Sequence, residues 1–102
     1  MNQAQLMAQV KKMQAEMTKA QEELATTLVT GTAAGGLVTV EATCDQRVKS
    51  VRIAKDAVDP DDLETLEDLV VVAMNDALSK STETSQKRMA SLTGGMRIPG
   101  FS

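Results

Sequence analysis

Few residues in this chain of 102 are of the types that catalyse reactions. It has no histidine to act as a general base or metal ligand, and Cys44 is its only cysteine, which also excludes an internal disulfide and fits a reducing compartment. Because Cys44 falls on the apolar side of an alternating segment, we interpret it as a small buried side chain rather than a nucleophile. The composition therefore argues against an enzyme.

Clustered acids are the next candidates for chemistry. Asp59, Asp61, Asp62 and Glu64 lie close together in sequence, as the oxygen ligands of a divalent cation do. We prefer a simpler interpretation, in which these acids stabilise the positive end of a helix dipole. The paired glycines at 35 and 36 are too short a motif for a phosphate-binding loop. We predict no metal and no other cofactor.

Basic residues remain, and the chemistry open to them is phosphate binding. The net charge is −3, but segment 59–78 holds seven acids and no base, whereas segment 79–102 holds four bases and one acid. Serine and threonine hydroxyls, which bond phosphate oxygens, surround the C-terminal bases. The principal candidate contacts are therefore Lys80, Lys87, Arg88 and Arg97.

Two other basic groups compete with this assignment. Near the N-terminus, Lys12 and Lys19 share a predicted helix face with two glutamates, so a solvated, salt-bridged surface explains them equally well. We include Lys11, Lys12 and Lys19 as secondary contacts. Arg47, Lys49 and Arg52 carry less weight, because protection of a sheet edge against unwanted pairing accounts for them.

A central helix, predicted to start at Asp59 and to run through Leu78, organises the chain. Asp59 suits the capping position and Pro60 the first helical position. Its apolar residues cover about 200° of helix surface, roughly twice what one sheet requires. We predict that the second contact is another copy of the chain. The expected interface residues are Leu63, Leu66, Leu69, Val70, Ala73, Met74 and Ala77.

A first helix is predicted from about residue 3 to residue 26, with Asn2 and Gln5 forming a capping box. Apolar residues repeat along it in the four-three spacing of a coiled-coil seam, namely Leu6, Val10, Met13, Met17, Ala20 and Leu24. At 1.5 Å per residue its length would be about 36 Å, more than a small domain covers. We therefore expect part of residues 1–27 to project.

Residues 28–55 are predicted to form a three-stranded antiparallel meander. Val38, Val40 and Ala42 alternate with polar residues, which indicates a strand with one buried face. Val48 is out of phase with Val51, so we expect a bulge. After Leu78 we predict an exposed polar helical extension, interrupted or not, up to residue 93, and then a tail over residues 94–102. The result is one α+β domain, α-β-β-β-α, spanning residues 1–102.

The order of these motifs resembles the YbaB/EbfC family of bacterial nucleoid-associated proteins over nearly the whole chain. The motifs are GGLV at 35–38, LEDLVVVAMNDA at 66–77 and GGMRIPGF at 94–101. One departure is the turn Asp45-Gln46, where such proteins often carry glycine. The resemblance implies a tweezers-like homodimer that binds and compacts duplex DNA in the cytoplasmic nucleoid without a cofactor.

We thus predict a non-enzymatic homodimer that grips duplex DNA mainly through phosphates, with little sequence specificity. Its binding would alter DNA conformation or compaction, with an effect on gene expression left open. Its partners would be duplex DNA and itself, with no small-molecule substrate. No membrane is expected, since no apolar run approaches about 18 residues. The alternative is a protein-interaction adaptor that uses the seam from Leu6 to Leu24 without binding DNA.

Overall fold

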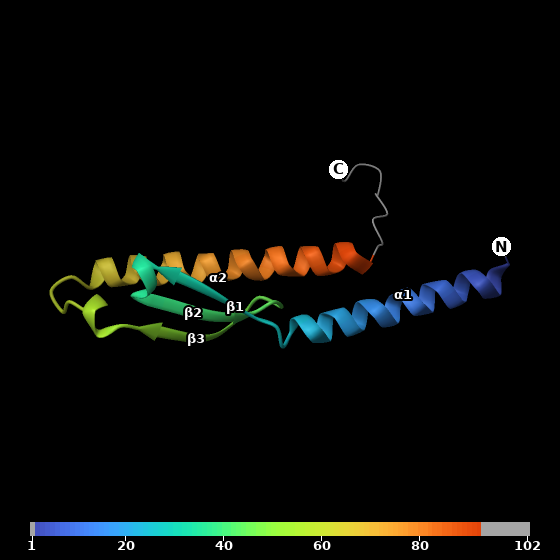
Figure 1. Cartoon of the computed structure of the whole chain (residues 1–102), viewed down its shortest axis with the longest axis horizontal. Coiled ribbons are helices and arrows are strands. Elements are labelled where there is room, and N and C mark those ends of the chain that lie inside the picture. The colour runs from blue at the N-terminus through green and yellow to red at the C-terminus, as the bar shows by residue number, and fades with distance from the viewer. Residues whose placement is uncertain (1, 93–102) are drawn as a thin grey trace, which may run out of the picture.

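The computed structural model of the chain describes residues 2–92 and has two long helices and one small sheet (Figure 1). The elements are α1 (Gln3–Leu24), β1 (Leu28–Ala33), β2 (Val38–Thr43), β3 (Arg47–Ile53) and α2 (Leu63–Leu92), with 3-10 turns at Ala34–Gly36 and Lys55–Ala57. The strands pair antiparallel in the order β1-β2-β3. The predicted α-β-β-β-α order and meander are confirmed.

Helix α1 projects from the sheet, as its length predicted (Figure 1). The Asn2 side chain caps it by accepting the N–H of Gln5 at 2.8 Å. Only Ala20 and Leu24, at its C-terminal end, are buried. Farther out, Leu6 and Val10 are 52% and 46% exposed. With extents of 70 × 27 × 17 Å, the molecule is elongated, and most of the apolar seam of α1 is not buried by any residue between 2 and 92.

Helix α2 starts at Leu63, so the prediction that it starts at Asp59 is wrong. The Asp62 carboxylate accepts the Thr65 N–H at 3.3 Å and the Thr65 hydroxyl at 2.6 Å, as an N-cap does. The Asp59 carboxylate instead accepts the N–H of Asp61 at 2.9 Å and closes the turn before the helix. From Leu63 the helix is continuous to Leu92. The polar extension after Leu78, for which the sequence leaves an interruption open, therefore follows without a break.

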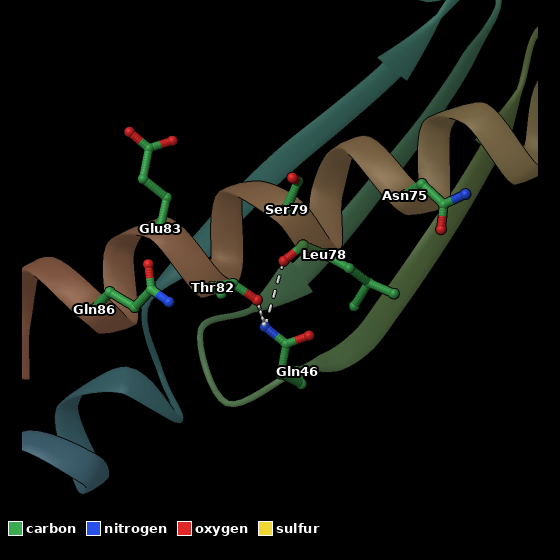
Figure 2. A pocket seen from close by; sticks show the side chains of 7 residues that line it. All are labelled: Gln46, Asn75, Leu78, Ser79, Thr82, Glu83 and Gln86. Carbon is green, nitrogen blue, oxygen red and sulfur yellow. Dashed lines mark hydrogen bonds between the residues drawn. The ribbon is translucent and has the colours of Figure 1, made fainter. Parts of the chain in front are cut away.

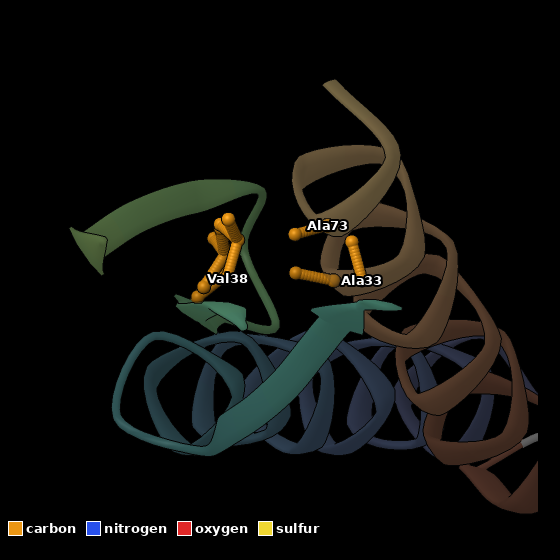
Figure 3. Packing of buried hydrophobic residues seen from close by; sticks show 6 residues of the cluster. Ala33, Val38 and Ala73 are labelled. Atoms are coloured by element: carbon orange, nitrogen blue, oxygen red, sulfur yellow. The ribbon is translucent and has the colours of Figure 1, made fainter. Parts of the chain in front are cut away.

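The core lies between α2 and one face of the sheet. Val38, Val40, Ala42 and Cys44 are buried on that face, which confirms the predicted alternation. Figure 3 shows Ala33 and Val38 from the sheet near Ala73 of α2. The facing side chains are mostly alanine and valine, so helix and sheet approach closely. At Gly31 they are so close that a Cβ would collide with backbone atoms of Ala73 and Ala77.

Strand β3 carries the predicted bulge. Glu41 pairs with Ser50 and Ala42 with Val48, which leaves Lys49 as the extra residue. Because of this bulge, Val48, Val51 and Ile53 all lie on the face of the sheet that α2 covers, yet they are 38%, 44% and 41% exposed. Their exposure follows from the position of α2, which packs over β1 and β2.

The predicted dimer-interface residues of α2 fall into two groups. Ala73 and Ala77 are completely buried in the core of their own chain, so they have no surface left for a second copy, and their assignment is corrected. Leu66, Leu69, Val70 and Met74 pack partly against the same core, and Leu63 is 53% exposed. The double-sided apolar pattern thus reflects a deep contact with the chain's own sheet in addition to an open flank.

Candidate nucleic-acid interface

Two of the predicted phosphate contacts in α2 are already engaged within the chain, and Lys80 is the first. Its Nζ lies 3.2 Å from Asp76 Oδ2 and donates to the carbonyl of Thr30 at 2.9 Å. The same Asp76 oxygen accepts the N–H of Thr32 at 3.0 Å, and this bond, followed by the bond from Lys80, lowers the pKa of Asp76. Asp76 and Lys80 therefore satisfy backbone groups of the edge strand β1.

Arg88 is the second engaged cation. Its Nη2 and Nε lie 3.0 and 3.2 Å from Glu23 Oε2, so this ion pair joins α2 to α1. Lys87 pairs with Glu83 at 3.0 Å, but both side chains are mostly exposed, and such pairs are weak. The fourth residue, Arg97, lies outside the described residues. Of the predicted C-terminal set, Lys87 is the described side chain with most freedom to bind phosphate.

The cations of α1, by contrast, have no ion-pair partner in the part of the chain that the structure describes. Lys11, Lys12 and Lys19 are exposed and form no ion pair with any residue between 2 and 92. The salt-bridged surface considered for this helix is not formed, because Glu23 binds Arg88 instead of Lys19. These lysines therefore lie unneutralised on the projecting helix, where a long polyanion has access to them.

Strand β3 and the turn after it hold a third set of cations, which the sequence analysis weighted least. Arg47, Lys49, Arg52 and Lys55 are exposed and likewise have no ion-pair partner within the described part of the chain. Sequence alone did not reveal this contrast, because it depends on which carboxylates reach which cations across the fold. The signal in the sequence was the run of cations along β3. It did not distinguish a phosphate-binding surface from protection of the sheet edge against unwanted pairing.

A hollow of about 570 Å³ lies beside α2 and the β2–β3 turn, and its lining does not suit an anion. Figure 2 shows amide and hydroxyl side chains around it, with Glu83 as its one charged lining residue. A second hollow of about 390 Å³ separates the base of α1 from α2 and includes Cys44 in its lining. Neither of these two hollows has a cation among its lining residues, so neither is suited to bind phosphate.

The unusual turn residue Gln46 anchors this region. Its backbone has a positive φ of 70°, which explains why glycine suits the position. Its Nε2 donates to Ser81 Oγ at 2.8 Å. It also donates to Thr82 Oγ1 at 2.8 Å and lies 3.3 Å from the Leu78 carbonyl (Figure 2). Ser81, expected to be exposed, is fully buried and donates to the carbonyl of Thr43 at 2.9 Å. The part of α2 directly after Leu78 is therefore packed against the sheet and the β2–β3 turn and does not project into solvent.

The acids before α2 act locally. Asp59 and Asp62 accept backbone N–H groups, and the bonds from Thr65, first from its hydroxyl, lower the pKa of Asp62. Within residues 2–92, no group of three or more histidine, cysteine, aspartate or glutamate side chains is arranged to hold a metal ion. Searched over the same residues, no helix has the length and apolar character to cross a membrane.

Comparison with known proteins adds independent information. The model of the YbaB/EbfC DNA-binding family matches residues 1–96. A nucleoid-associated protein of Chloroflexus aurantiacus is 50% identical over 97 residues, which cover 95% of this chain and 97% of that protein. A nucleoid-associated protein of Roseiflexus sp. is 48% identical over 101 residues, covering 99% and 100%.

The fold also has a counterpart among solved structures. The crystal structure of an uncharacterized protein from Helicobacter pylori superposes with a TM-score of 0.80 at 21% identity. The match covers 92% of this chain and 99% of that one. At this identity the likeness concerns the fold, and it supports the arrangement of a small sheet with two long helices.

Proposed function

The chain belongs to the YbaB/EbfC DNA-binding family, and from this premise we propose that it is a non-enzymatic, nucleoid-associated homodimer that binds duplex DNA through phosphates. The single observation that carries the proposal is the family match over residues 1–96 together with relatives named nucleoid-associated proteins. The proposed location is the bacterial nucleoid, and no cofactor is part of the proposal.

The geometry supports α1 as the main DNA-contacting element. Lys11, Lys12 and Lys19 are exposed, carry no ion pair within residues 2–92 and lie on a helix that extends beyond the sheet. Lys87 is a further candidate on the neighbouring helix, since its pair with Glu83 is exposed and easily exchanged for a phosphate. Lys80 and Arg88 hold the fold together in this proposal, and Arg97 remains a candidate.

The chain offers little for reading base sequence. Single-strand and base-stacking recognition depends on aromatic platforms, and the only aromatic residue in the sequence is Phe101. Lysine contacts to phosphates position a protein on the duplex but carry no direct sequence information. We therefore propose weak sequence dependence and an affinity that falls steeply with salt, by about 0.9 logarithmic units per neutralised phosphate for each tenfold rise in salt.

The uncovered face of β3 supports a homodimer. Helical spacing places Val71, Met74 and Leu78 on the flank of α2 opposite Asp76 and Lys80, which is the flank near the β2–β3 turn. Val71 is 56% exposed, and with the exposed residues of β3 this flank forms an apolar trough. We propose that a second copy covers the trough, each side chain contributing about 1 kcal/mol. Leu63 stays in the proposed interface.

The proposal can be tested by fluorescence anisotropy with labelled random-sequence duplexes at about 50 and 200 mM salt. The wild-type protein should bind several unrelated duplexes alike and should lose affinity steeply at the higher salt. The triple variant Lys11→Gln, Lys12→Gln, Lys19→Gln should bind about tenfold or more weakly at low salt, with a slope shallower by about 1 to 3.

A charge-retaining variant is the control. Lys11→Arg, Lys12→Arg, Lys19→Arg keeps three cations on the same helix and should retain the salt slope. Absence of any complex with wild-type protein at low salt would contradict DNA binding altogether. If the glutamine and arginine variants bind like wild type, DNA binding stands but α1 is not the contact surface.

One observation favours the adaptor as a second candidate function. Leu6, Val10 and Met17 on α1 are 52%, 46% and 42% exposed, so the seam is available to a partner helix. The adaptor hypothesis predicts that the double variant Leu6→Glu, Val10→Glu loses a protein partner. Its DNA affinity should equal that of wild-type protein, including the case in which wild type binds no DNA. The salt titration of wild-type protein distinguishes the two candidates, because an adaptor alone gives no salt-dependent complex with DNA.

A further inference from the structure

The outer face of the sheet, which faces away from α2, is not covered by any other element of the described residues. Antiparallel pairing places its side chains in three rows across the strands. The rows are Thr32–Thr39–Arg52, Thr30–Glu41–Ser50 and Leu28–Thr43–Arg47. Five of these side chains carry hydroxyls and two carry guanidinium groups, so the face is polar, with one exposed leucine at its margin.

The cations of this face are not neutralised within the described residues. Arg47 and Arg52 belong to the rows, Lys49 is the bulged residue between them, and Lys55 follows the strand. Glu41 is the one carboxylate in the rows and lies more than 4.0 Å from these cationic groups. Asp45, in the adjoining turn, accepts the hydroxyl of Thr43. Cations therefore outnumber acids along β3.

The face also has a hollow of about 250 Å³, lined by Thr30, Thr39, Glu41, Ser50 and Arg52. At about 3.3 Å per residue, Arg47 and Arg52 lie about 15 Å apart along β3. One DNA strand carries a phosphate for about every 3.4 Å of helix axis, so more than one phosphate of a strand lies within that span. Hydroxyls between the arginines can donate to the intervening phosphate oxygens.

We propose that the outer face of the sheet is a second contact surface for the phosphate backbone of duplex DNA, separate from the lysines of α1. The inference rests on the proposed DNA-binding function and extends it, because one subunit then contacts duplex at two places. The competing explanation is that Arg47, Lys49 and Arg52 only prevent β3 from pairing with other strands. The two explanations predict different results for the same variant.

The test compares DNA binding of the sheet variant Arg47→Gln, Lys49→Gln, Arg52→Gln with that of the α1 lysine variant. The sheet variant should bind random duplex at least threefold more weakly at about 50 mM salt, with a salt slope shallower by about 1 to 3. The swap Arg47→Lys, Lys49→Arg, Arg52→Lys keeps the charge and should restore the slope. As controls, circular dichroism checks that each variant is folded like wild type, and sedimentation checks that it assembles like wild type.

A second variant is expected to bind DNA more tightly than wild type, a result that misfolding would not produce. Glu41→Gln removes the carboxylate from the middle of the face and should tighten binding about twofold or more. The control is Glu67→Gln, which removes the same charge from an exposed position on α2 and should leave affinity unchanged. Tighter binding of Glu41→Gln alone supports the inference. Equal affinity of wild type and Glu41→Gln overturns it.

The outcomes also separate this inference from the proposed function. If the α1 lysine variant binds weakly while the sheet variant binds like wild type, the second surface is wrong and the proposed function stands. Aggregation of the sheet variant with unchanged affinity of its soluble fraction favours edge protection and also overturns the inference. If wild-type protein binds no duplex at low salt, the proposed function fails and the second surface fails with it.

Discussion

Gly31 permits a close contact between the sheet and α2. It lies on the buried side of β1, directly beneath the backbone of Ala73 and Ala77. Any Cβ at this position would overlap those backbone atoms, which belong to a regular helix and cannot turn aside as a side chain would. The absence of a side chain is required here by space, not by the backbone conformation.

We predict that Gly31→Ala destabilises the protein by about 3 kcal/mol, because α2 must move away from the whole sheet to admit one methyl group. Urea unfolding followed by circular dichroism measures the loss. The neighbouring change Thr32→Ala keeps the backbone and trims an exposed side chain, so it should cost less than about 0.5 kcal/mol. Similar stability of the two variants would contradict the proposed lack of space.

Gln46 combines an unfavourable backbone conformation with favourable side-chain bonds. Its left-handed φ of 70° costs about 1 kcal/mol for a residue with a Cβ, and its amide donates to hydroxyls of α2. We predict that Gln46→Ala loses about 2 kcal/mol and Gln46→Gly about 1 kcal/mol, since glycine loses the bonds but adopts this φ freely. Thermal or urea unfolding of both variants checks the order, and a glycine variant less stable than the alanine variant contradicts it.

Asp76 makes stability depend on acid pH. The N–H of Thr32 and then Lys80 stabilise its charged form, so its pKa in the folded chain lies below the ordinary value of 3.8. This contribution is present above about pH 4, where the carboxylate is charged in both states, and is lost as pH falls through the lower folded pKa. Asp62, with its bonds from Thr65, adds an effect of the same sign.

We therefore expect Asp76→Asn to be less stable than wild type at pH 7 but closer to it at pH 3. Urea midpoints at the two pH values measure the difference. The control is Asp68→Asn, an exposed acid of the same helix with no hydrogen bond or ion pair to another described residue. It should shift the midpoint about equally at both pH values. If the difference in urea midpoint between wild type and Asp76→Asn is the same at pH 7 and pH 3, the charge of Asp76 does not contribute to stability.

At the scale of elements, the contact between α1 and α2 determines how far the projecting helix is fixed. Only the last turn of α1 is buried, and a hollow of about 390 Å³ lies beside it. Within the described residues, Arg88 and Glu23 form the ion pair that joins the two helices. The orientation of α1 therefore depends on a few contacts close to its C-terminal end.

Glu23→Gln should widen the range of α1 orientations while changing stability by less than about 1 kcal/mol, because the pair is partly exposed. Double electron–electron resonance measures the distribution of distances between spin labels placed at positions 9 and 86. For this experiment Cys44 is replaced by alanine, and labelled chains are diluted in unlabelled protein. Glu22→Gln is the matched control and should leave the distribution unchanged. A narrow, unshifted distribution in Glu23→Gln would rule out the ion pair as the restraint.

Elements with local causes were predictable from sequence. The Asn2 cap, the alternation of Val38 and Val40 and the bulge near Val48 each depend on neighbouring residues and occur as expected. The start of α2 was misplaced because both Asp59 and Asp62 suit a cap, and only the bonds from Thr65 decide between them. The candidate site was less predictable. The ion pair of Lys80 with Asp76 is local, four residues apart on one helix, but the Thr30 carbonyl that Lys80 also bonds and the Glu23 partner of Arg88 are 50 and 65 residues away in sequence.

At the scale of the whole molecule, the trough between β3 and α2 is where we expect the second subunit. Val51→Glu places a charge on this trough and should convert the dimer into monomers, as measured by sedimentation at micromolar concentration. Ser50→Glu places the same charge on the outer face of the sheet and should leave the assembly unchanged. A dimer that persists in Val51→Glu would exclude this trough as the interface.

The bonds that Asp76 and Lys80 make to β1 limit how copies of the sheet can join. With the Thr32 N–H and the Thr30 carbonyl occupied by side chains of α2, an incoming strand cannot bond these two groups of β1. We therefore expect β1 to be the poorer template for strand addition. Copies that join edge to edge through β3 alone would form a closed pair and leave no second β3 margin for a third copy.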